Sequence, residues 1–165
     1  MILNQKETTL LKDIKSQEKL CVDKYTACAE EASDPKLKQL FKSIGSTEQQ
    51  HLNTVEQLLN GTIPQLGSSS GSKQNTPGSS ASAIDMKYNP SSNTTAVTGD
   101  AKTHDKYLCS DTLASEKHVS SVYNTSIFEF RDEKVRDVLN HIQTEEQEHG
   151  KQIYDYMSQH DMYNN

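Results

Sequence analysis

The chain has no tryptophan, only four prolines and only three cysteines in 165 residues. The cysteines (Cys21, Cys28 and Cys109) are odd in number and form no C-x-x-C pair, so neither a disulfide framework nor a cysteine zinc site is expected. Positive charge is also scarce: 17 Lys and Arg stand against 23 Asp and Glu, and a net charge of -6 gives no support to nucleic-acid binding. No apolar run approaches the roughly 20 residues of a membrane-spanning helix, and residues 1–7 lack the pattern of a signal peptide.

The apolar content of 32% is low for a globular chain, and the deficit lies in one segment. Ser, Thr, Gly, Pro and Asn occupy 25 of the 40 positions from 61 to 100. Such a segment cannot bury enough apolar surface to offset its chain entropy. The sequence therefore predicts a flexible crossover over 61–102, which joins two helical hairpins, 8–60 and 103–160, into one domain.

Four helices are predicted, over residues 11–32, 35–59, 104–130 and 133–158. Asp34 and Pro35 suit the N-cap and first position of the second helix, and Asn60-Gly61 suits its end. A break at 131–133 separates the third helix from the fourth.

The two hairpins also repeat each other. A shift of 98 residues, without a gap, gives 11 identities over the 46 positions from 13 to 58. Two copies of a hairpin with an apolar stripe bury their stripes against each other, which predicts an all-α four-helix bundle.

Charged residues stand at mid-helix positions where the stripe should be apolar. Spacings of three and four residues place Glu18, Glu48, Glu116 and Glu146 in the four stripes, and a His follows three residues after Glu48 and after Glu146. The set predicted to meet in the bundle centre is thus Glu18, Glu48, His51, Glu116, Glu146 and His149. The nearby Glu145 and Glu148 are out of phase with the stripe and are expected to face solvent.

Four buried carboxylates are too costly to remain charged and unpaired. Two divalent cations would cancel their charge, and neutral imidazoles would complete the ligand shell; such ligands suit Fe or Mn, and also Zn. The alternative is an internal polar network, or a vestigial site, that holds no metal.

This ligand pattern resembles that of ferritin-like di-iron and di-manganese proteins, in which two helices each supply a Glu and two supply Glu-x-x-His. The resemblance implies terminal ligands at Glu18 and Glu116, bridging ligands at Glu48 and Glu146, and nitrogen ligands at His51 and His149. It also implies that Tyr25 and Tyr123 lie next to the metal ligands, as hydrogen-bond donors to a carboxylate or, less commonly, as radical carriers. No second carboxylate follows Glu116 one turn later, unlike the rubrerythrin type.

A second resemblance is carried by longer segments. Residues 34–41 and 48–52, and the later stretches 116–123, 128–132 and 141–150, are similar to the Coat F domain of spore coat proteins in endospore-forming bacteria. That resemblance implies a ferritin-like fold, synthesis in the mother-cell cytoplasm, and deposition in the spore coat. Its partners would be other coat proteins or further copies of the chain, with no nucleic acid and no membrane.

Three functions follow as hypotheses. The first is a structural coat component whose metal site stabilises the bundle. The second is a di-iron or di-manganese oxidase, peroxidase or catalase that acts on O2 or peroxide. The third is a helical binding module that uses the crossover as a partner segment.

Overall fold

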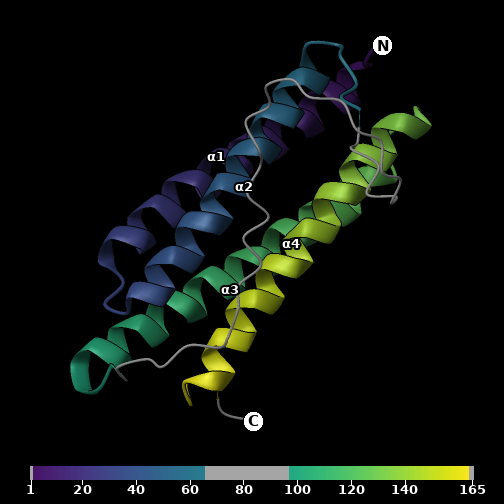
Figure 1. Cartoon of the computed structure of the whole chain (residues 1–165). Helices are drawn as coiled ribbons and strands as arrows, with labels where there is room; N and C mark the ends of the chain where they lie inside the picture. Colours follow the sequence, from purple (N-terminus) through teal and green to yellow (C-terminus); the bar gives the residue numbers. More distant parts are fainter. Residues whose placement is uncertain (1, 66–96, 164–165) are drawn as a thin grey trace, which may run out of the picture.

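The computed structural model describes residues 2–65 and 97–163, and these form four α-helices. The helices are α1 (Gln5–Glu31), α2 (Pro35–Leu59), α3 (Gly99–Ile127) and α4 (Glu133–Gln159). Figure 1 shows two antiparallel hairpins, α1 with α2 and α3 with α4, packed against each other along their length. The described residues contain no β-strand, and the predicted all-α four-helix bundle is confirmed. None of the described helices is long and apolar enough to cross a membrane.

Helix boundaries follow local capping signals. Asp34 caps α2 by accepting a hydrogen bond from the main-chain N–H of Lys36, with Pro35 at the first helical position. Asp132 caps α4 in the same way. After α2, Gly61 takes a positive φ of 81°, which glycine adopts without strain. The predicted breaks on either side of α2 and before α4 are therefore confirmed.

Two helices start earlier than the periodicity predicts. The first begins at Gln5 instead of 11, because Asn4 and Glu7 form a reciprocal capping box ahead of the apolar stripe. The third begins at Gly99 instead of 104 and ends at Ile127 instead of 130. Apolar periodicity detects only the packed turns of a helix, so it misses the first turn of α1, which the capping box holds in place, and the first turn of α3, which has no side-chain cap.

The connection between the hairpins joins opposite ends of the bundle. The last residues of α2 lie at the end where α1 begins, whereas α3 begins near the turn between α1 and α2 (Figure 1). A 27-residue helix is about 40 Å long, and this is the separation that the connection has to cover. Most of the predicted crossover, residues 66–96, lies outside the described residues.

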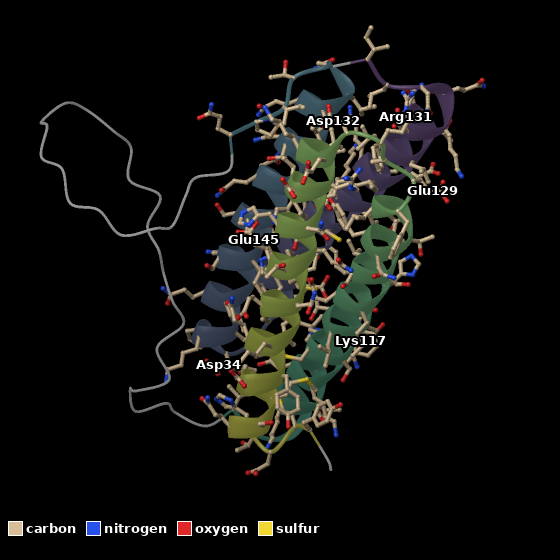
Figure 2. All side chains as sticks on the ribbon, turned by 90° about the vertical axis from the view of Figure 1, so that its right-hand side faces the viewer. Asp34, Lys117, Glu129, Arg131, Asp132 and Glu145 are labelled. Atoms are coloured by element: carbon tan, nitrogen blue, oxygen red, sulfur yellow. The ribbon has the colours of Figure 1, made fainter. Side chains whose placement is uncertain are left out.

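Each hairpin clamps the turn of the other. A carboxylate oxygen of Glu7 accepts the main-chain N–H of Arg131 at 3.1 Å, beside the turn between α3 and α4. At the other end Asp105 accepts the main-chain N–H groups of Ser33 and Asp34 at 2.7 and 3.0 Å. Positions 7 and 105, like 33 and 131, are 98 residues apart, so the repeat extends into these contacts. Figure 2 shows the two turns, marked by Asp34 and by Arg131 with Asp132, at opposite ends of the bundle.

The core is divided into two apolar clusters with a polar layer between them. One cluster lies toward the α1–α2 turn and includes Phe41, Ile44 and Ile153. The other lies toward the α3–α4 turn and includes Leu11, Ile14 and Leu139. Between them lie the buried charged residues that the sequence places in the stripes. The apolar clusters on both sides thus shut this layer off from solvent along the bundle axis.

Candidate metal centre

The six residues predicted to meet in the bundle centre lie together there, and none is more than 3% exposed. Each of the four helices contributes a glutamate to the layer, and α2 and α4 contribute a histidine as well. They are Glu18, Glu48, His51, Glu116, Glu146 and His149. The near-complete burial means that their charges are not screened by water.

The layer divides into two overlapping groups. Ligand atoms of Glu18, Glu48, His51 and Glu146 lie within 4.8 Å of one another, and so do those of Glu48, Glu116, Glu146 and His149. Glu48 and Glu146 belong to both groups, and each remaining residue belongs to one. If each group held one cation, the two cations would share the carboxylates of Glu48 and Glu146.

The layer is short of hydrogen bonds. In the part of the chain that the structure describes, every buried side-chain nitrogen or oxygen without a hydrogen-bond partner belongs to these six residues. At about 1–3 kcal/mol for each buried unpaired group, the eight atoms together would cost roughly 8–24 kcal/mol. That is as large as the whole stability of an ordinary domain, about 5–15 kcal/mol. Cations or extra protons therefore have to compensate them, and the oxygen-rich, imidazole-containing set suits Fe, Mn or Zn.

Both histidines point the same ring nitrogen into the layer. Nδ1 of His51 lies 3.0 Å from Glu146 and 3.6 Å from Glu48, and Nδ1 of His149 lies 2.8 Å from Glu48. The two rings stack with centroids 5.6 Å apart. None of these Nδ1 contacts has the geometry of a hydrogen bond, so neither nitrogen is paired by a hydrogen bond with another of the described residues.

Glu18 and Glu116, which each belong to only one of the two groups, are the outer carboxylates of the layer. A tyrosine from the other hairpin donates a hydrogen bond to each of them. Tyr123 of α3 donates its hydroxyl to Glu18 of α1 at 2.5 Å, and Tyr25 of α1 donates to Glu116 of α3. The two bonds are related by the 98-residue repeat. They satisfy one oxygen of each outer carboxylate and leave the other, Oε2 in both, unpaired and directed at the layer.

The metal-free layer holds protons. Burial raises the pKa of Glu18 to about 8 and that of Glu146 to about 9. Burial alone would lower the pKa of His149, but the nearby Glu116 and Glu48 carboxylates outweigh it and raise the pKa to about 10. Without metal at neutral pH, protons therefore take the place that cations would otherwise fill.

The structure corrects the expectation that Glu145 faces solvent. Its carboxylate lies 3.0 Å from Nε2 of His51, on the opposite side of the ring from the layer, and its side chain is 37% exposed. Position 145 is on the flank of the stripe, and the flank of α4 reaches α2. The repeat could not reveal this contact, because position 47 in the first hairpin is a threonine.

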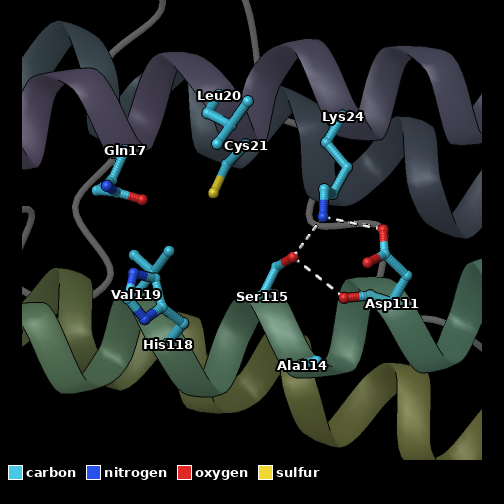
Figure 3. A pocket seen from close by; sticks show the side chains of 9 residues that line it. All are labelled: Gln17, Leu20, Cys21, Lys24, Asp111, Ala114, Ser115, His118 and Val119. Carbon is cyan, nitrogen blue, oxygen red and sulfur yellow. Dashed lines mark hydrogen bonds and ion pairs between the residues drawn. The ribbon is translucent and has the colours of Figure 1, made fainter.

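A pocket lies between α1 and α3. It has a volume of about 240 Å³, and its lining includes Cys21 and Val119, each one turn after an outer glutamate (Figure 3). Lys24 closes one side through bonds to Asp111 at 2.9 Å and to the Ser115 hydroxyl at 2.7 Å. Burial, followed by the charges of the four layer carboxylates, raises the pKa of the Cys21 thiol. Like Cys28 and Cys109, Cys21 is buried and free.

Comparison with known protein families gives a match over part of the chain. The Coat F domain family model matches residues 104–165. This range contains most of α3 and the whole of α4, and with them half of the layer: Glu116, Glu146 and His149. The match supports the relationship to spore coat proteins that the segments of the second hairpin indicate. No curated protein and no solved structure matches the chain significantly, and the ferritin-like relationship stays a prediction.

Proposed function

We propose that the protein is a structural component of the spore coat whose bundle is stabilised by two divalent metal ions in the central layer. The match of the second hairpin to the Coat F domain supports the place in the coat. The observation that carries the metal site is the set of eight buried, unpaired ligand atoms arranged around two positions with shared carboxylates. The partners would be other coat proteins or further copies of the chain.

Glu18 and His51 would hold one metal, Glu116 and His149 the other, and Glu48 and Glu146 would bridge the two. Each metal replaces protons in the layer and cross-links three helices. Because the ligands come from all four helices, binding favours the folded bundle over the unfolded chain by mass action. A coat component that has to persist for long periods gains from such internal cross-links.

The first test is metal content, measured by elemental mass spectrometry on protein purified without a chelator or an affinity tag. The proposal expects about two Fe or Mn ions per chain in the unaltered protein, one for each of the two groups that share Glu48 and Glu146. The double variant Glu48→Ala/Glu146→Ala should lose both. No metal in either form, with unchanged thermal stability in the variant, would leave a polar layer without a metal function.

A second candidate function is an oxidase, peroxidase or catalase that acts on O2 or peroxide at the same two metals. The observation that favours it is the pocket between α1 and α3, whose lining includes Cys21 and Val119, each one turn after Glu18 or Glu116. Fe or Mn would supply the redox chemistry, while Cys21 and Val119 would limit what approaches. Consumption of O2 or peroxide by fully loaded protein tests this, and its absence would leave the structural role.

A further inference from the structure

The two halves of the layer are not equivalent, although the repeat relates them. Nε2 of His51 has a carboxylate partner, Glu145, at 3.0 Å. The corresponding position for His149 is Thr47, whose hydroxyl bonds the main-chain carbonyl of Ser43 in its own helix. Among the described residues, no hydrogen bond to Nε2 of His149 is found. The repeat is therefore broken at the residue that supports the imidazole.

A carboxylate on the outer nitrogen of a ligand imidazole has two effects. It fixes the tautomer, with the proton on Nε2 and the lone pair on Nδ1, and it holds the plane of the ring. It also makes the coordinating nitrogen more basic, so that it binds a metal ion more strongly. Nδ1 of His51 already faces Glu18, Glu48 and Glu146, so both effects would act on the metal position that His51 serves.

We propose that Glu145 makes the two metal positions unequal, so that the one at His51 binds its ion more tightly and fills before the one at His149. This inference rests on the proposed metal centre and adds an order of filling to it. Loss of such a supporting carboxylate typically weakens metal binding by about 10- to 100-fold. The same factor is expected between the two positions.

Glu145 also has a second neighbour, which defines the competing explanation. Nε2 of His141, one turn earlier on α4, lies 3.4 Å from the same carboxylate oxygen. If Glu145 served only as the partner of His141 on the bundle surface, its removal would leave metal binding unchanged. Figure 2 shows Glu145 along the length of α4 and away from both turns, so it has no part in capping or in the clamps.

The experiment isolates one position at a time. His149→Ala leaves the His51 position intact, His51→Ala leaves the His149 position intact, and Mn2+ is the probe in isothermal titration calorimetry. We expect His149→Ala to bind its first Mn2+ about 10- to 100-fold more tightly than His51→Ala. Adding Glu145→Gln to His149→Ala should remove the tighter binding of the first Mn2+. Adding it to His51→Ala should leave Mn2+ binding unchanged.

The complementary variant adds a carboxylate at the position that corresponds to Glu145. Thr47→Glu in the His51→Ala background should tighten Mn2+ binding at the His149 position. Electron paramagnetic resonance at one equivalent of Mn2+ gives a second readout. The unaltered full chain should show mainly isolated ions, and Glu145→Gln should shift the signal toward coupled pairs and empty protein. Circular dichroism of each metal-free variant checks that the bundle is folded.

The outcomes separate the inference from the proposed function. Unaltered protein that binds no Mn2+, Fe2+ or Zn2+ would overturn the metal centre itself. Protein that binds two ions, with a Glu145→Gln effect that is absent or equal in both histidine backgrounds, would overturn only the unequal positions. A Thr47→Glu variant without effect would likewise overturn the explanation through Nε2 support.

Discussion

Glu146→Gln gives the sharpest single perturbation of the central layer, because its effect should depend entirely on whether metal is present. Glu146 is completely buried and belongs to both groups of ligand atoms. Burial raises its pKa to about 9, so in the metal-free protein at pH 7 it is a neutral acid. An amide has the same shape and the same lack of charge. The free energy of unfolding of the metal-free protein should therefore change by less than about 1 kcal/mol, below the roughly 1–3 kcal/mol that a newly unpaired buried group would cost.

With metal the result should be different. An ion at 100 times its dissociation constant stabilises the folded state by about 2.7 kcal/mol, so two such ions would contribute about 5 kcal/mol. For a domain of this size that corresponds to roughly 10–20 °C in Tm. A neutral amide cannot replace the shared carboxylate, and Glu146→Gln should lose most of this gain.

Differential scanning calorimetry measures both effects on the same samples, once with a chelator and once with excess Mn2+. Glu148→Gln is the matched control, since it changes the same functional group at an exposed position on the same helix. A metal-free Glu146→Gln protein destabilised by more than about 2 kcal/mol, the cost of an unpaired buried group, would refute the neutral-acid reasoning. A full metal-dependent gain in the variant would refute the bridging role.

Three further predictions concern protons, the tyrosines and the clamps. The pKa of Glu18 is raised to about 8 in the folded protein, so between about pH 5 and 8 the metal-free folded protein binds more protons than the unfolded chain. Its free energy of unfolding should therefore fall as the pH rises through this range. The affinity for Mn2+ should rise over the same range, because the metal competes with protons for the ligands. Titrations in buffers of different ionisation enthalpy would count the released protons, and a count of zero would contradict this. Tyr123→Phe should cost the metal-free protein about 1–3 kcal/mol in urea unfolding, since it leaves a buried carboxyl oxygen of Glu18 unpaired. A neutral result would mean that the bond to Glu18 adds no net stability. Asp105→Asn should cost about 1–3 kcal/mol, because an amide replaces one of the two oxygens that accept main-chain N–H groups. Glu7→Gln, its repeat counterpart, should also destabilise the bundle, and thermal unfolding of the two variants would show whether the clamps act alike.

Much of the fold could be predicted from the sequence because its signals are local. A cap at Asp34 followed by Pro35, and Gly61 after α2, act within one helical turn, so they set boundaries in any context. Where the local signal was a capping box ahead of the apolar stripe, at Asn4 and Glu7, periodicity alone placed the start too late.

The candidate site could be found for a related reason. A glutamate in an apolar stripe has to point at the other helices, and the repeat doubles that constraint. The sequence by itself therefore determined which six residues meet, though their role as metal ligands stays a prediction. The pairing of Tyr25 with Glu116 and of Tyr123 with Glu18 depends on α1 and α3 lying alongside each other in antiparallel directions.

Only the tertiary structure decided what happens on the flanks of the stripes. Whether Glu145 meets water or His51, and whether Glu7 and Asp105 reach the opposite turn, depends on how each helix is rotated and how far it is shifted along its neighbour. Periodicity fixes the face that a helix buries, but a flank residue can lie on either side of the boundary. A rotation of a few tens of degrees would move Glu145 from His51 to solvent, and the packing of the four helices as a whole selects that rotation.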